Sequence, residues 1–165
     1  MNNDLKAKQL ATEIGNILAG QNATLATAES CTGGLIASLL TDISGSSRYF
    51  KGGVVSYTNE IKAQVLGVKQ ETLNKFTAIS SETAYEMAAG VQKLMKTDFA
   101  VSVTGNAGPN PSEGKEVGLV YFGLAIKNKI VTIEKHFNGT RDENKENIAL
   151  TGLELLLNEL RNKLL

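Results

Sequence analysis

Residues 24–40 read TLATAESCTGGLIASLL and place a short apolar stretch, a polar turn and an apolar run next to one another. The small and apolar residues 24–28 predict a short buried strand. The turn that follows ends in two adjacent glycines, Gly33 and Gly34, and the run 35–40 predicts a helix. A strand that passes through a glycine-containing turn directly into a helix is typical of α/β proteins.

The same alternation of strands and helices extends outward over the rest of the chain. Further strands are predicted over 54–57 and 99–103, followed by a hairpin of 117–126 and 130–137 about Asn128. Further helices are predicted over 5–18, 60–66 and 70–76, after Ser80 or Ser81, and over 142–164. We therefore expect an α/β protein, a three-layer α/β/α sandwich with a mixed, largely parallel sheet, forming a single domain over residues 1–165.

Apolar residues at helical spacing predict which faces two of these helices bury. In the helix after Ser81 they are Ala84, Met87, Ala88, Val91, Leu94 and Met95. In the last helix they are Leu150, Leu153, Leu157, Leu160 and Leu164. The second set is too short for a sustained coiled coil, so it indicates core packing more than a dimer seam, and a homodimer or higher homo-oligomer stays an alternative.

Composition excludes several classes of protein. With 42% hydrophobic and 21% charged residues, the 165-residue chain is an ordinary globular protein. Seventeen basic and seventeen acidic residues cancel, which leaves no electrostatic signature of nucleic-acid or membrane binding. One cysteine and one histidine exclude a disulfide framework and a multi-histidine metal site. The polar N-terminus and the lack of a long apolar stretch predict a cytoplasmic location.

In sheets of this kind, ligands bind beyond the carboxyl ends of the parallel strands. Three loops are predicted there, at 29–34, 57–62 and 104–116, and they are rich in Gly, Ser, Thr and Lys. The site is therefore expected where these loops meet.

The first loop contains two candidate nucleophiles, Ser30 and Cys31. A serine at a strand-to-helix turn is well placed to attack a substrate, and N–H groups at Gly33 and Gly34 could hold an oxyanion. The alternative is that Ser30 or Thr32 only caps the helix. Cys31 would need a base or a cationic partner to react as a thiolate, and lone cysteines are more often small buried apolar residues.

The second loop places Lys62 one turn into a helix that starts near Thr58. Lys62 could act as a general base only if desolvation or a nearby positive charge lowered its pKa, and the alternative is a solvated surface lysine. Tyr57 could position a hydroxyl or relay a proton, and the alternative is a strand residue with a buried ring.

The third loop follows a buried strand and contains Gly105 and Gly108, like a phosphate-binding turn. It is not a Walker A motif, because Pro109 stands where the first glycine would be and Glu116 follows Lys115. A looser backbone cradle for one phosphate or carboxylate is predicted, with a long surface loop as the alternative.

Two further side chains, His136 and Arg141, could take part in chemistry. His136 shares the polar face of its strand with Thr132 and Glu134, so it is expected to be solvated, which removes a Ser-His-Asp triad. Arg141 joins the last strand to the final helix and suits capture of a phosphate or carboxylate. Its alternative role is to pair with the acidic residues 142–143.

Five motifs occur in a characteristic order and spacing. They are AESCTGG at 28–34, FKGG at 50–53, Y-x-N-x-x-K at 57–62, TG-x-AGP at 104–109 and F-x-G-x-R at 137–141. Together they resemble the carboxy-terminal domain of the CinA competence/damage-inducible family, over about residues 8–162. No part of the sequence resembles the other domain of that family, which is molybdopterin-binding-like.

The resemblance implies an enzyme of pyridine nucleotide salvage. It would hydrolyse the carboxamide of nicotinamide mononucleotide to nicotinic acid mononucleotide and ammonia, with no metal and no cofactor. By the same resemblance Ser30 is the nucleophile and Lys62 its base, Tyr57 and Thr104 support the pair and the oxyanion, and Arg141 binds substrate. The expected partner is this small nucleotide. The glycines expected beside it are Gly33, Gly34, Gly105 and Gly108.

Three positions depart from the family pattern: Asn106, the loop 110–116 and Lys145. They are expected to border the substrate and to affect affinity and specificity more than chemistry. The alternative function is a non-catalytic nucleotide-binding or interaction module linked to competence or DNA damage. The joint presence of the five polar residues assigned above favours the enzyme.

Overall fold

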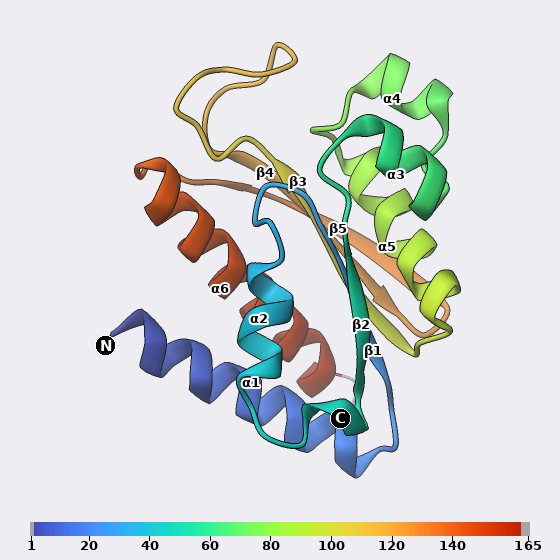
Figure 1. Cartoon of the computed structure of the whole chain (residues 1–165), viewed down its shortest axis with the longest axis vertical. Coiled ribbons are helices and arrows are strands. Elements are labelled where there is room, and N and C mark those ends of the chain that lie inside the picture. Colours follow the sequence, from blue (N-terminus) through green and yellow to red (C-terminus); the bar gives the residue numbers. More distant parts are fainter. Residues whose placement is uncertain (1, 163–165) are drawn as a thin grey trace.

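The computed structural model describes residues 2–162 and shows a five-stranded sheet between two layers of helices (Figure 1). The strands are β1 (Leu25–Glu29), β2 (Phe50–Val55), β3 (Phe99–Gly105), β4 (Leu119–Ile126) and β5 (Lys129–His136). The helices are α1 (Asn3–Gly20), α2 (Leu35–Thr41), α3 (Asn59–Leu66), α4 (Gln70–Phe76), α5 (Ser81–Met95) and α6 (Arg141–Asn162), with a short 3-10 helix at Ser46–Arg48.

The strand order β2-β1-β3-β4-β5 makes a mixed sheet. β1 runs parallel to both β2 and β3, and β4 and β5 continue the sheet with antiparallel pairings. Helices α1, α2 and α6 lie on one face, and α3, α4 and α5 lie on the other (Figure 1). The predicted α/β/α sandwich is thus confirmed, and the loops that follow β1, β2 and β3 meet at one edge of the sheet.

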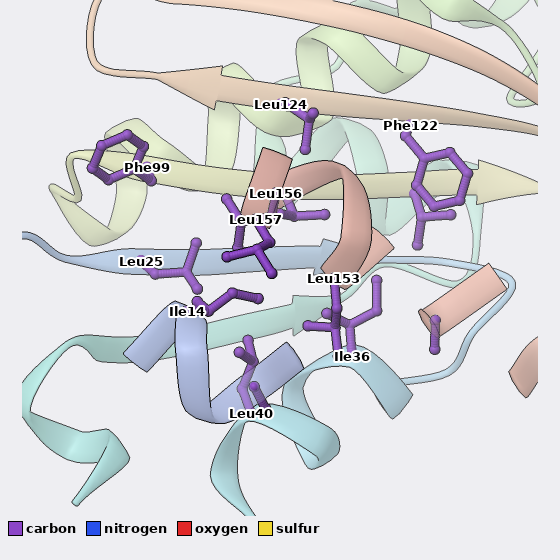
Figure 2. Close-up of a cluster of buried hydrophobic side chains, with 14 of the residues drawn as sticks. Ile14, Leu25, Ile36, Leu40, Phe99, Phe122, Leu124, Leu153, Leu156 and Leu157 are labelled. Atoms are coloured by element: carbon purple, nitrogen blue, oxygen red, sulfur yellow. The ribbon is translucent and has the colours of Figure 1, made fainter. Parts of the chain in front are cut away.

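The two faces of the sheet carry side chains of different size. On the face covered by α1, α2 and α6 the strands contribute large residues, Leu25, Phe99, Phe122 and Leu124 (Figure 2). On the face covered by α5 they contribute Ala26, Ala28, Ala100 and Ala125. Small residues let α5 come close to the sheet, since a Cβ added to Gly123 would lie 2.4 Å from the carbonyl oxygen of Ala84.

Strand β2 lies earlier in the sequence than predicted, at Phe50–Val55 instead of 54–57. The pair Gly52-Gly53, which suggests a turn, is inside the strand. A Cβ on Gly53 would lie 2.2 Å from the Thr27 hydroxyl of the neighbouring strand, so this position has room only for glycine. Tyr57 consequently lies beyond the strand, in the connection to α3.

The predicted apolar stripes are confirmed with one exception. Leu94 of α5 is 50% exposed, whereas Ala84, Met87, Ala88 and Val91 are buried. In α6 the leucines at 150, 153, 157 and 160 are buried, which confirms core packing, and Leu164 lies outside the described residues.

A buried carboxylate holds the start of α2. Glu29, at the end of β1, accepts the Thr32 hydroxyl at 2.7 Å, the Ile36 N–H at 2.8 Å and the Ala37 N–H at 2.9 Å. A negative charge at a helix N-terminus satisfies amides that have no partner inside the helix. Glu29 therefore fixes the angle at which the chain leaves β1 and turns past Ser30.

We expect Glu29→Ala to lower the free energy of unfolding by about 3 kcal/mol, because it leaves buried N–H groups without an acceptor. Denaturant unfolding measures this loss. Glu29→Gln keeps one side-chain oxygen acceptor and should lose less. A loss below about 1 kcal/mol for the alanine variant would contradict this role.

Candidate active site

The three loops enclose a cavity of about 370 Å³ at the carboxyl ends of β1 and β3. Cavities that take small molecules commonly fall at roughly 300–1,000 Å³. The predicted site residues that line it are Ser30, Tyr57, Lys62, Thr104, Gly105, Gly108 and Arg141. Residues far apart in the sequence thus meet at the edge of the sheet where ligands were expected.

Ser30 and Lys62 face each other in this cavity. Ser30 follows β1 directly, and its N–H donates to the Val103 carbonyl of β3 at 3.0 Å, which fixes its backbone. Lys62 lies in α3, and its Nζ is 3.0 Å from Ser30 Oγ. Lys62 is 1% exposed and Ser30 is 7% exposed, so the two side chains form a buried pair. The alternative of a solvated surface lysine is wrong.

The surroundings of Lys62 favour its neutral form. Burial lowers the pKa of the amine, and the negative charge of the Glu113 carboxylate opposes this effect. Nζ also lies 2.8 Å from the Ser56 carbonyl and 3.4 Å from the Tyr57 carbonyl. A neutral amine has two N–H groups for these carbonyls and one lone pair, which leaves the lone pair for the Ser30 hydroxyl. This geometry suits a general base.

Cys31 lies beside Ser30 but packs into the core under α1, α2 and α6. Burial raises the pKa of its thiol to about 12, with the Glu29 carboxylate adding to the effect and Lys62 opposing it. The thiol is therefore protonated at neutral pH, and the thiolate needed for attack is absent.

Arg141, the first residue of α6, contacts two predicted site residues in the cavity wall. Its guanidinium donates to the Tyr57 hydroxyl at 3.1 Å and to the Gly108 carbonyl. Tyr57 is 57% exposed, so the alternative of a buried ring is wrong. The three residues together form one wall of the cavity and present a positive charge to it.

Thr104 makes a hydrogen bond that the sequence did not indicate. Its hydroxyl donates to the Ala78 carbonyl at 2.7 Å and so connects the end of β3 with the segment before α5, which also lines the cavity. Gly105 follows in the wall, where a Cβ would lie 2.7 Å from the Leu119 carbonyl oxygen. Gly108 has a φ of +95°, which favours glycine.

The structure does not place Gly33 and Gly34 in the cavity wall, where the resemblance led us to expect them. The Gly33 N–H donates to the Ser30 carbonyl at 3.0 Å, and the first amides of α2 are taken by Glu29. With φ of +63° and +100°, the two glycines instead allow the tight turn between β1 and α2.

Asn106 and Asn144 organise the cavity wall through backbone contacts. The Asn106 side chain accepts the Gly108 N–H at 2.9 Å and donates to the Asn110 carbonyl at 2.9 Å. Asn144, fully buried in α6, donates to the carbonyls of Ala107 at 3.1 Å and Gly139 at 3.0 Å. Its position one turn after Arg141 is the only sequence signal that could have indicated it. Lys145, also expected near substrate, is not in the lining.

His136 does not line the cavity, which agrees with the expectation that it is not a catalytic base. Its two ring nitrogens are each 3.0 Å from a carboxylate oxygen, of Glu116 and Glu134. Over residues 2–162 no three His, Cys, Asp or Glu side chains gather as metal ligands would, and none of the described helices is long and apolar enough to cross a bilayer.

Known proteins are similar to this chain over most of its length. The model of the CinA C-terminal domain family matches residues 7–160. A CinA-like protein from Endomicrobium trichonymphae is 50% identical over 152 residues, covering 92% of this chain and 36% of that protein. One from Leptospira borgpetersenii is 48% identical over 151 residues, covering 90% of this chain and 36% of that protein. The chain spans about a third of the length of these curated relatives.

Solved structures share the fold over nearly the whole chain. A competence-damaged protein (CinA) superfamily protein from Klebsiella pneumoniae matches with a TM-score of 0.92 and 30% identity, over 98% of this chain and 99% of that chain. A competence/damage inducible protein from Agrobacterium tumefaciens matches with a TM-score of 0.88 and 41% identity, over 93% and 96% of the two chains. Family model, relatives and structures agree, and the chain belongs to the CinA C-terminal domain family.

Proposed function

We propose that this protein hydrolyses the carboxamide of nicotinamide mononucleotide to nicotinic acid mononucleotide and ammonia. The observation that carries the proposal is the buried pair in the cavity, with Lys62 Nζ 3.0 Å from Ser30 Oγ. A serine at hydrogen-bond distance from a buried amine whose pKa is lowered can be activated as a nucleophile, as acyl transfer requires. The family resemblance supplies the substrate.

The proposed reaction has two halves. Ser30 Oγ attacks the carboxamide carbon while its proton passes to Lys62, and the tetrahedral intermediate then expels ammonia after Lys62 returns the proton to the leaving nitrogen. Water, deprotonated by Lys62, attacks the resulting ester and releases the carboxylic acid and Ser30. The N–H of Cys31, adjacent to the nucleophile, is our candidate donor to the oxyanion.

Substrate binding is assigned to the part of the cavity wall formed by Arg141, Tyr57 and Gly108. Arg141 carries the positive charge, and its contacts with Tyr57 and Gly108 hold the guanidinium in one orientation before a ligand arrives. A guanidinium in a fixed orientation suits the phosphate of a mononucleotide.

The test is to incubate the purified protein with nicotinamide mononucleotide and to quantify ammonia and the acid product together. Equal amounts of both support the proposal. Binding of the nucleotide by calorimetry without either product would favour the alternative, a nucleotide-binding module without catalysis.

We expect Cys31→Ala to keep at least about half of the wild-type kcat/KM, because the thiol is protonated and forms no bond in the reaction. Steady-state kinetics on the two proteins measure this. Loss of activity in a variant that unfolds at the wild-type denaturant concentration would show that Cys31 takes part in the chemistry.

We expect the rate to be unchanged after dialysis against a strong chelator, because every group in the proposed steps is supplied by the protein, the substrate or water. The comparison is of kcat before and after the treatment. An activity that disappears and returns on adding zinc or magnesium would contradict the serine mechanism.

A further inference from the structure

The loop between β3 and β4 contains a tight turn at residues 112–115. Ser112 and Lys115 exchange backbone hydrogen bonds of 3.1 and 2.8 Å, and the two residues between them, Glu113 and Gly114, have φ of +50° and +71°. Two consecutive positive φ values define a type I′ turn, whose first position favours Asn, Asp or Gly. A glutamate there adopts a strained backbone conformation, so other contacts must hold it.

The Glu113 side chain makes two such contacts. Its carboxylate accepts the Ala78 N–H at 2.8 Å and the Asn59 side-chain N–H at 3.2 Å. Asn59 is the first residue of α3, the helix that carries Lys62. The Ala78 carbonyl is the acceptor of the Thr104 hydroxyl. One carboxylate thus connects the turn with two other segments of the cavity wall.

We propose that Glu113 is a positioning residue, whose carboxylate fastens the 112–115 turn to α3 and to the segment at Ala78 and so sets the shape of the cavity beside Ser30 and Lys62. Its kinetic consequence rests on the proposed function, but its structural consequence does not. Glu113 itself lines the cavity.

The charge of Glu113 has a second effect that makes the role testable. Its carboxylate raises the pKa of Lys62 against the effect of burial. The other ionisable groups in the cavity wall are Cys31, whose thiol is protonated at neutral pH, Tyr57 and Arg141. Removing the Glu113 charge should therefore let the pKa of Lys62 fall further, which keeps the amine neutral down to a lower pH.

The experiment compares Glu113→Gln and Glu113→Ala with wild type and with a matched control, Glu116→Gln. Glu116 is in the same loop, but it pairs with His136 and does not line the cavity. The first readout is the rate at which phenylmethylsulfonyl fluoride labels Ser30 as a function of pH, followed by intact mass. The second is hydrogen exchange of the Ala78 amide, and the third is kcat and KM for nicotinamide mononucleotide.

Both Glu113 variants should shift the acid limb of the labelling profile to lower pH and label several-fold faster on that limb, whereas Glu116→Gln should follow wild type. Glu113→Ala should also exchange the Ala78 amide several-fold faster and raise KM several-fold. Wild-type profiles and wild-type exchange in the Glu113 variants would overturn the proposal.

The three readouts distinguish a failure of this proposal from a failure of the proposed function. If wild type does not turn over the nucleotide, the function is wrong, and labelling and exchange still decide the role of Glu113. If Glu113→Ala does not fold, Glu113→Gln decides it, because glutamine keeps the volume and one acceptor oxygen while removing the charge.

Discussion

Ser30→Ala is expected to lower kcat for nicotinamide mononucleotide by at least about 10⁴-fold, because it removes the atom that would form the acyl-enzyme. The fold should survive the change. Only one hydroxyl is lost, and the Lys62 amine keeps the Ser56 and Tyr57 carbonyls as acceptors. We expect the free energy of unfolding to change by less than about 1 kcal/mol.

Kinetics and denaturant unfolding on the same preparation test both parts of this prediction. Cys31→Ala is the matched control, since it truncates the neighbouring side chain in the same turn. An active Ser30→Ala beside an inactive Cys31→Ala would reverse the assignment of the nucleophile. Mass spectrometry during turnover offers a second check, because an acyl group should appear on wild type and on Cys31→Ala but not on Ser30→Ala.

Lys62→Arg is expected to lower kcat/KM by roughly 10²–10⁴-fold, nearly as much as Lys62→Ala. Arginine keeps a positive charge but does not give up its proton in proteins, so it cannot accept the proton of Ser30. If Lys62 acted only through its charge, arginine would restore most of the rate. Near-normal turnover by Lys62→Arg would therefore exclude the general base while leaving Ser30 as a candidate nucleophile.

The pH profile tests the same residue in wild type. The amine accepts a proton only when neutral, so kcat/KM should fall as the pH drops through the pKa of Lys62 in the free enzyme. Burial lowers this pKa from its ordinary value of 10.5, so the acid limb should lie below 10.5. The residual kcat/KM of Lys62→Ala should not show this acid limb.

The layers of the fold and the loops that line the cavity could be predicted from the amino-acid sequence. Apolar periodicity and turn residues identified the strand-turn-helix unit at 24–40 and the strands and helices that alternate after it. This works because the residues that a strand or helix buries recur at a regular spacing in the sequence. The boundary of β2 was missed, since a glycine pair looks the same in a turn and in a strand crowded by a neighbour. The motifs also identified the family.

The tertiary structure alone decided how the site residues relate to one another. The lysine at 62 has the same sequence signature whether it is solvated or buried, and its burial beside Ser30 depends on how α3 packs over the end of β1. Glu29 and Glu113 look like ordinary acidic residues in the chain, and their partners come from other segments or from the next helix. Distances and desolvation arise from packing between segments far apart in sequence, and local patterns do not encode them.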